Sequence, residues 1–400
     1  MLLDGIVIVD ATDRLGWLAG RLLADLGAEV IKLEPRGSDH NCSQWRAANV
    51  NKRVLELEPG NAADRERIEA LLGAADICLL TAQAAQFSSL LDPAALRVSF
   101  PRLVVVTITP FGGRGPRAHW KASDLELMAA GGAMALAGEP DGMPVRISQP
   151  QSYAWAGAQA AAGALIALYQ REATGRGDLV EVSAQACVVT ALSHAPAFVD
   201  LGGIEPTRAG AFITGRSIKG ARYRVFWPCL DGYINFIFYG GAAGRRTNAQ
   251  LVAWMRERGA ELGALPTIDW KSWDATQADQ SEVDAIEAPV MKFFAAISKR
   301  EFLQEGHRRE MLGYPVSTVA DIASDPQLEA RGFFQSVAGS AERFCGSFAV
   351  IDGVRPPLRY FPGEPLASHS LDTTPPCGAE IDRHSEETNG RVGAYQGEHA

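Results

Sequence analysis

The chain has 400 residues, of which 47% are hydrophobic and 21% charged, enough for two or three domain-sized units with buried cores. The net charge of −9 argues against a general binder of nucleic acids or anionic membranes, because such proteins present a basic surface. Six scattered cysteines include no Cys-x-x-Cys and no Cys/His cluster at zinc spacing, so the sequence predicts reduced thiols and no metal site.

Targeting signals are not evident in the sequence. The opening MLLDGIVIVD lacks a basic n-region and meets Asp4 early, and no apolar run reaches the roughly 18 residues that a membrane span needs. We therefore expect a cytoplasmic protein without membrane contact.

The first forty residues indicate a strand, a helix and a second strand. Ile6–Val9 is a short apolar run, typical of a strand buried on both faces. Leucines and alanines recur at spacings of three and four over residues 15–26, and Gly27 follows them, as it does at many helix ends. Val30–Leu33 completes a βαβ unit, which implies a parallel sheet.

The same alternation continues to about residue 205. The pattern predicts helices over residues 61–72, 124–136 and 153–171, and strands over 76–80 and 103–108, with a return to strand in GRGDLVEVS (175–183). The strand at 103–108 ends in the glycine-rich loop PFGGRGP. We interpret residues 1–205 as the first part of a large α/β domain with a Rossmann-like parallel sheet.

The alternation of predicted strands and helices ends after residue 205. YRVFWPCLDGYINFIFY predicts two strands joined by a turn at Asp231 and Gly232, and helical stretches follow. We therefore expect residues 206–330 to form a small α+β domain and residues 331–400 to return to the large domain. The polar tail from about Ser368 is expected to be loosely ordered.

Six segments, in order, resemble the family III CoA-transferases, which include formyl-CoA transferase and the α-methylacyl-CoA racemases. They are LADLGAEVIKLEPRGSD (23–39), NKRVLELE (51–58), FGGRGP (111–116), GGAMALAGEPDGMPVR (131–146), REATGRGDLVEVS (171–183) and TVADIASDPQLEARGFF (318–334). The resemblance implies a large α/β domain built from both chain ends, an inserted small domain and an interlocked-ring dimer.

The resemblance also implies a chemistry. In the transferases an Asp carboxylate attacks the acyl-CoA thioester, forming a mixed anhydride and then an enzyme-bound CoA thioester. The racemases use the same Asp with a His as an acid/base pair. The resemblance therefore implies a CoA thioester as substrate and no resident cofactor.

The expected carboxylate is missing. When the family's Asp segment is laid on PVRISQPQSYAWAG, the Asp position falls on Tyr153, flanked by Ser152 and Ala154. The racemase His position falls on Ser123. A phenol of ordinary pKa about 10 is barely ionised at pH 7, so Tyr153 is expected to fill space and donate a hydrogen bond. The nearest acids, Asp124 and Asp141, are expected to be structural.

Evidence for a CoA site is mixed. Basic and polar residues at positions implied by the resemblance are weak candidates for contacting CoA: Arg36, Asn51, Lys52, Arg53 and Lys121. Against this, the family's N-F-R-P-G and R-[LM]-G adenine segment is replaced by LLTAQAAQFSSLLDPAAL over residues 79–96.

Three hypotheses remain open. The first is a non-catalytic subunit that supports a second family III subunit, as in the succinyl-CoA:benzylsuccinate CoA-transferases. The second is a self-sufficient acyl-CoA transferase, racemase or isomerase with a relocated acid. The third is a non-enzymatic binding protein on the same fold.

Overall fold

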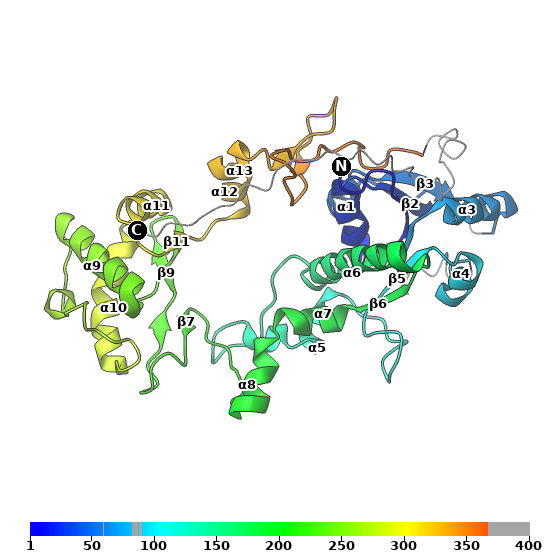
Figure 1. The fold of residues 1–400 in the computed structure, drawn as a ribbon. Helices are drawn as coiled ribbons and strands as arrows, with labels where there is room; N and C mark the ends of the chain where they lie inside the picture. The colour runs from blue at the N-terminus through cyan, green and yellow to red at the C-terminus, as the bar shows by residue number, and fades with distance from the viewer. Residues whose placement is uncertain (59, 82–86, 88–89, 367–400) are drawn as a thin grey trace, which may run out of the picture.

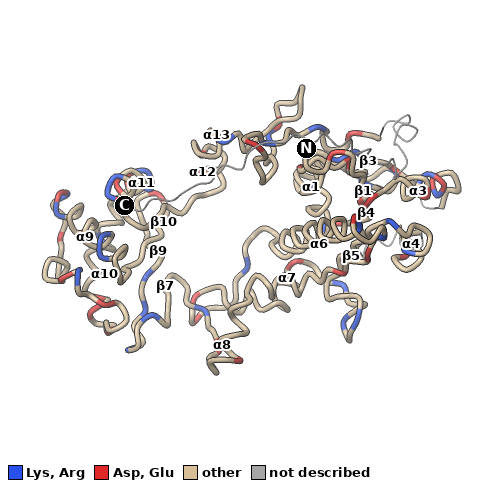
Figure 2. Tube along the Cα trace, viewed as in Figure 1, with Lys and Arg blue, Asp and Glu red and all other residues tan. Residues whose placement is uncertain are grey.

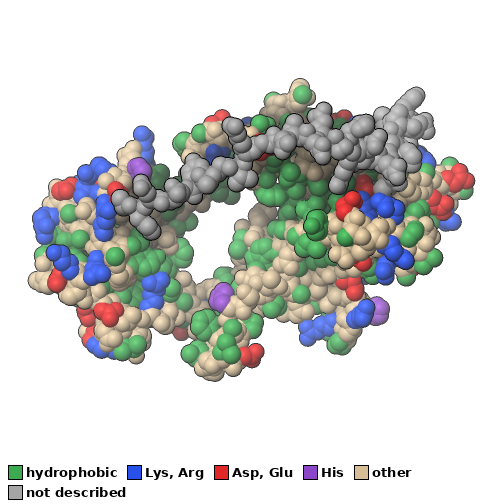
Figure 3. Space-filling model, viewed as in Figure 1, with side chains coloured by type: hydrophobic (Ala, Val, Ile, Leu, Met, Phe, Trp, Pro, Cys, Tyr) green, Lys and Arg blue, Asp and Glu red, His purple; other side chains and the backbone are tan. Residues whose placement is uncertain are grey.

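The protein consists of two lobes joined by two connecting stretches of chain, which together surround an opening (Figure 1). The space-filling view shows that side chains do not close this opening (Figure 3). The computed structural model describes residues 1–58, 60–81, 87 and 90–366. The polar tail expected from Ser368 lies outside these residues.

Six parallel strands form the central sheet of the large lobe, in the order β3-β2-β1-β4-β5-β6. The strands are β1 (Val7–Ala11), β2 (Glu29–Pro35), β3 (Arg53–Leu57), β4 (Ile77–Thr81), β5 (Val104–Thr109) and β6 (Leu179–Ser183). This is a doubly wound order, which confirms the expected α/β fold class. Strand β3 was not among the expected strands, and its sequence, RVLEL, places Arg53 and Glu56 among apolar residues.

Helices cover both faces of this sheet. Helices α1 (Trp17–Asp25) and α6 (Ser152–Thr174) pack on one face, and α3 (Ala62–Ala74) packs on the other. Gly157 of α6 permits a close approach, because a Cβ there would lie 2.8 Å from the Cβ of Leu18 in α1. The remaining helices of this lobe and its neighbouring connector are α2 (Ser43–Asn49), α4 (Pro93–Ser99), α5 (Asp124–Ala130), α7 (Ala184–Ala191) and α8 (His194–Gly202).

The helix expected over residues 124–136 is interrupted. Helix α5 ends at Ala130, and a short 3-10 helix, η1 (Ala133–Leu136), follows. Gly132 between them has φ of +85°, a left-handed conformation that ends an α-helix.

The small lobe has its own core of aromatic and aliphatic side chains around Trp227, Trp254 and Phe294. Three antiparallel strands pair in the order β11-β10-β9, and the expected turn at Asp231 joins β9 to β10. The helices and strands of residues 212–345, in the small lobe and in the connecting stretches, are β7 (Phe212–Ile213), β8 (Tyr223–Arg224), β9 (Phe226–Cys229), β10 (Gly232–Asn235), α9 (Gly241–Glu257), η2 (Leu265–Thr267), α10 (Gln280–Ala295), α11 (Lys299–Arg308), β11 (Tyr314–Pro315), α12 (Val319–Ala323), α13 (Pro326–Ala330), β12 (Phe334–Gln335) and β13 (Phe344–Cys345).

The chain returns to the large lobe after the small one. The amide of Val54 in β3 donates to the carbonyl of Glu364 at 2.7 Å, and Leu366 donates back to Val54 at 2.8 Å. The amide of Asn51 likewise donates to the carbonyl of Tyr360. Both ends of the described chain therefore build the large lobe, while the expected borders at residues 205 and 330 stay a prediction.

A buried ion pair lies beneath the carboxyl end of β1. The Lys52 ammonium donates to Asp10 Oδ2 at 2.7 Å, and both side chains are fully buried. Its other protons go to the Trp17 carbonyl and to Asn49 Oδ1. Burial lowers the pKa of Lys52 to about 8 although Asp10 opposes this. Burial also acts to raise the pKa of Asp10, but the nearby lysine charges outweigh it and hold that pKa below its usual range.

The same cluster fixes the loop that follows β1. Asp10 Oδ1 accepts from both the amide and the hydroxyl of Thr12, and buried Lys32 donates to the Thr12 carbonyl at 2.7 Å. The amide of Asp13 donates to the hydroxyl of Thr81 at the end of β4. Residues 12–14 are therefore held at the junction of β1 and β4.

Helix α6 begins under a carboxylate from α5. Asp124 Oδ1 accepts from the amides of Gln151 and Ser152 and from the Ser152 hydroxyl, each at 2.8 Å. Amides at a helix N-terminus lack partners within the helix, so this carboxylate satisfies groups that burial would otherwise penalise.

The Asp10–Lys52 pair generates a stability prediction. Lys52→Met should lower the free energy of unfolding by about 3–5 kcal/mol at pH 7, because it leaves the Asp10 carboxylate buried without its cation. Urea denaturation followed by circular dichroism measures the change. Lys292→Met is the matched control, since Lys292 pairs with Glu261 on the surface and should hardly move the midpoint. Equal effects of the two substitutions would contradict a structural role for the buried pair.

The cap on α6 generates a second prediction. Asp124→Ala should lower the free energy of unfolding by about 1–2 kcal/mol, because the first amides of α6 lose their acceptor. The exposed neighbour Asp141 serves as the control, and Asp141→Ala should leave the urea midpoint unchanged. An Asp124 variant as stable as the parent would show that the cap contributes nothing.

Candidate functional site

The sheet order places a topological switch point between β1 and β4. In open α/β sheets, ligands bind outside the carboxyl ends of the strands at such a point. The loop of residues 12–14 lies there, and two pockets flank it, one on each face of the sheet.

The first, called here the Tyr153 pocket, has a volume of about 300 Å³ and lies on the face covered by α1 and α6. It contains the position where the family resemblance expects a nucleophile. Its walls come from the loop after β1, from α1 and α2, and from the start of α6. The lining residues are Arg14, Trp17, Leu18, Gln44, Ala47, Ala48, Gln149, Pro150, Tyr153 and Ala154.

Tyr153 lies in the first turn of α6, half-buried, and its hydroxyl oxygen accepts the amide of Asp124 at 3.0 Å. Burial raises the pKa of the Tyr153 phenol, and the opposing effects of the Asp124 amide and the Arg14 cation are smaller. The phenol is therefore protonated at neutral pH. Such a group can donate a hydrogen bond but cannot attack a thioester as a carboxylate does.

The neighbouring acids do not supply the missing nucleophile in this conformation. The Asp124 oxygen that faces α6 is already an acceptor for three donors. Asp141 is exposed and does not line the Tyr153 pocket.

Two of the residues expected to contact CoA, Asn51 and Lys52, lie in the core of the large lobe. Lys52 is fully buried, and its three protons are committed to Asp10, Trp17 and Asn49. Asn51 is also buried, donates to Asp25, and accepts the amide of Arg359. In this structure both side chains hydrogen-bond within the core of the large lobe, so the proposal that they contact CoA gains no support from their positions.

Arg53 is also poorly placed for the switch point. It opens β3 at the amino edge of the sheet, where it pairs with Glu29 at 3.1 Å and lies over the ring of Tyr360. Ligands are expected at the opposite, carboxyl edge.

Arg36 and Lys121 remain as exposed candidates. Arg36 directly follows β2 at the carboxyl edge, where its guanidinium lies 3.2 Å from Asp64. Lys121 is exposed in the loop before α5. Seven residues of the replaced adenine segment, 82–86 and 88–89, lie outside the described residues.

Sequence reasoning missed Arg14. It is exposed on the loop after β1, lines the Tyr153 pocket, and donates to the side-chain oxygen of Gln44. Its position was a usable signal, because the first loop of a βαβ unit lies at the carboxyl edge of the sheet.

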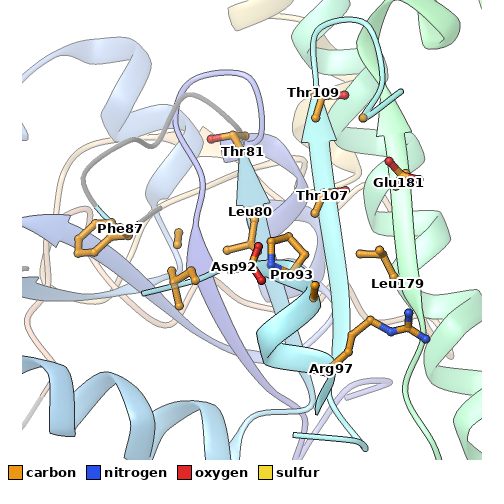
Figure 4. A pocket seen from close by; sticks show the side chains of 14 residues that line it. Leu80, Thr81, Phe87, Asp92, Pro93, Arg97, Thr107, Thr109, Leu179 and Glu181 are labelled. Carbon is orange, nitrogen blue, oxygen red and sulfur yellow. The ribbon is translucent and has the colours of Figure 1, made fainter. Parts of the chain in front are cut away.

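The second pocket, of about 520 Å³, lies on the opposite face of the sheet beside α4. In Figure 4, Thr107 and Thr109 of β5 and Glu181 of β6 lie along this face, with Asp92 and Arg97 nearby. The hydroxyls can hydrogen-bond a polar ligand. However, two carboxylates against one guanidinium do not favour a phosphate.

Charge and composition add two observations on the described part of the chain. Lys and Arg are interspersed with Asp and Glu over both lobes rather than separated (Figure 2). Within the described residues, no cluster of three or more His, Cys, Asp or Glu could hold a metal ion, and no helix is long and apolar enough to cross a bilayer.

Comparison with solved structures supports the fold. A CAIB/BAIF family protein from Brucella suis superposes with a TM-score of 0.78 at 23% identity, covering 90% of this chain and 96% of that one. Rv3272 from Mycobacterium tuberculosis gives a TM-score of 0.70 at 20% identity, covering 93% and 98%. At this level of identity the likeness concerns the fold alone.

Comparison with curated proteins identifies similar sequences. Succinyl-CoA:(R)-benzylsuccinate CoA-transferase subunit BbsE of Thauera aromatica is 31% identical over 349 residues, covering 82% of each chain. Probable CoA-transferase Rv1866 of Mycobacterium tuberculosis is 30% identical over 399 residues, covering 94% of this chain but only 47% of that protein. This chain thus spans about half the length of the second relative.

The sequence profile of CoA-transferase family III matches residues 3–366. A match over nearly the whole chain agrees with both the doubly wound sheet and the order of the motifs. The chain therefore belongs to CoA-transferase family III.

Proposed function

We propose that this chain is a non-catalytic subunit of a family III CoA-transferase. The complete enzyme would move CoA from an acyl-CoA, such as succinyl-CoA, to a carboxylic acid, such as an aromatic succinate. A second family III subunit would supply the nucleophilic Asp, and this chain would support that subunit and shape the acid site.

The observation that carries this proposal is the protonated phenol of Tyr153 at the position of the family's carboxylate. Nucleophilic catalysis needs a carboxylate whose oxygen is free to attack the thioester carbon and displace the CoA thiolate. Tyr153 has its pKa raised by burial, and Asp124 is committed to the α6 amides. The Tyr153 pocket thus contains no described residue suited to that step.

Apolar side chains on the surface of the chain support a close association with a second subunit. Exposed apolar side chains occur on the connectors and on α8, including Met143 at 85%, Leu201 at 89% and Val319 at 84% exposure. Hydrophobic side chains also gather at the rim of the opening (Figure 3). Large exposed apolar areas mark interaction sites in soluble proteins. An interlocked dimer, with a partner chain threaded through the opening, would cover them.

The similarity to BbsE, which is itself described as a subunit, supports a two-subunit enzyme. A self-sufficient enzyme would need an acid from elsewhere in the chain to reach Tyr153. A non-enzymatic binding protein would show no acyl transfer with any partner.

The proposal predicts that CoA transfer occurs only when this chain is mixed with a second, Asp-bearing family III subunit. Succinyl-CoA and benzylsuccinate are the first substrate pair to test, with the purified chain alone and then with an Asp-bearing family III subunit encoded by a neighbouring gene. Hydroxylamine converts an aspartyl–CoA thioester to an aspartyl hydroxamate with release of CoA, and mass spectrometry should locate that hydroxamate adduct on the partner's Asp. An adduct on this chain, formed without the partner, would overturn the proposal and identify a relocated nucleophile.

Restoring the carboxylate alone should not restore activity. Tyr153→Asp should leave CoA transfer by the isolated chain at background, because Asn51 and Lys52 are buried and the sequence lacks the family's adenine segment. Tyr153→Asn is the matched control for loss of the phenol. CoA transfer by the Asp variant that clearly exceeds that of the Asn variant would show that a working CoA site is present.

A further inference from the structure

We propose that the Tyr153 pocket binds the free carboxylate of an organic acid with an apolar body, held by the Arg14 guanidinium and the Tyr153 hydroxyl. The inference rests on the proposed function, because it names the acid site that this subunit would shape. It concerns binding to this chain, not the attack on a thioester.

Arg14 provides a cation at the mouth of the pocket. Its guanidinium donates to the neutral side chain of Gln44, and among the described residues it pairs with no carboxylate. A guanidinium has five N–H donors arranged in a planar fork that fits a carboxylate with two parallel hydrogen bonds. Most of these donors remain available at an exposed position.

Tyr153 provides a second donor in the same pocket. Its oxygen accepts the amide of Asp124, while no described group accepts its own hydroxyl proton. The phenol can therefore donate that proton to a ligand oxygen. The family's carboxylate at this position would instead repel an anion, so the replacement changes what the pocket can hold.

Two carboxylates close to Tyr153, those of Asp13 and Asp124, already accept hydrogen bonds from backbone amides. Asp13 Oδ1 accepts the amide of Leu15 at 3.0 Å, and Asp124 Oδ1 caps α6. These hydrogen bonds direct both carboxylates toward backbone amides. Neither carboxylate lines the Tyr153 pocket, whereas the Arg14 guanidinium does.

The rest of the pocket is mainly apolar. Trp17 and Leu18 of α1, Ala47 and Ala48 of α2, and Pro150 supply this surface. A volume near 300 Å³ is at the lower end of the range for small-molecule sites, roughly 300–1,000 Å³. The pocket therefore suits a compact acid with an apolar or aromatic body, and not a whole acyl-CoA.

Isothermal titration calorimetry of the purified chain tests this inference without catalysis. The probe is 3-phenylpropanoate. The matched neutral probe is 3-phenylpropan-1-ol, and succinate tests a carboxylate without the apolar body. We expect 3-phenylpropanoate to bind at least about tenfold more tightly than either, since the site requires both features.

Variants assign the contact to its residues. Arg14→Gln should weaken binding of 3-phenylpropanoate by about tenfold or more, Arg14→Lys should weaken it less, and Tyr153→Phe should weaken it severalfold. Arg300→Gln is the control, because Arg300 is an exposed arginine on the small lobe, and this change should leave affinity unaltered. Circular dichroism should show that all variants remain folded.

The outcomes separate this inference from the proposed function. Equal binding of acid and alcohol, no effect of Arg14→Gln, or no acid binding by either the chain or its mixture with the partner would overturn the inference. In an active mixture, Arg14→Gln should raise KM for the acid and leave kcat nearly unchanged. Acid binding through Arg14 without CoA transfer in any mixture would support the pocket and reject the subunit role.

Discussion

The buried pair of Asp10 and Lys52 is the constraint on which the large lobe depends. It joins the end of β1 to the start of β3, and Lys52 also holds the backbone of α1 through the Trp17 carbonyl. Gly20 of α1 makes room for the pair, since a Cβ there would lie 2.3 Å from Asp10 Oδ2. A buried pair is costly to form, but once one ion is present the other becomes necessary.

The Asp10–Lys52 pair also fixes the loop that carries Arg14 to the candidate site. Asp10 orders Thr12 through two hydrogen bonds, and this ordering places the exposed Arg14 over the Tyr153 pocket. A surface arginine thus stands on a loop whose backbone is fixed by buried charges. Preorganisation of this kind reduces the entropy that a ligand must overcome on binding.

Local sequence patterns were sufficient for much of the fold. The apolar runs that became β1, β4 and β5 were recognisable because parallel strands are buried on both faces. Helix α5 was predicted too long because periodicity does not register the left-handed conformation of Gly132. Strand β3 was missed because its sequence, RVLEL, mixes charges with apolar residues.

The site was less predictable than the fold, for a physical reason. A lysine beside an arginine in the sequence suggests a solvated pair, yet Lys52 is buried and Arg53 lies at the wrong edge of the sheet. Burial is decided by partners distant in sequence, such as Asp10, which local patterns do not reveal. Position 153 was identifiable from its motif, but the commitment of Asp124 to the cap required coordinates.

The return of the chain to β3 has a consequence for biosynthesis. Asn51 is hydrogen-bonded to Arg359, 308 positions later, and Val54 is bonded to Glu364. The large lobe therefore cannot be completed on the ribosome until the whole small lobe has emerged. During that interval the edge of β3 is an unpaired strand edge, and such edges favour mispairing with other nascent chains. Segments at opposite ends of the chain must therefore both be available before this edge of the large lobe is closed.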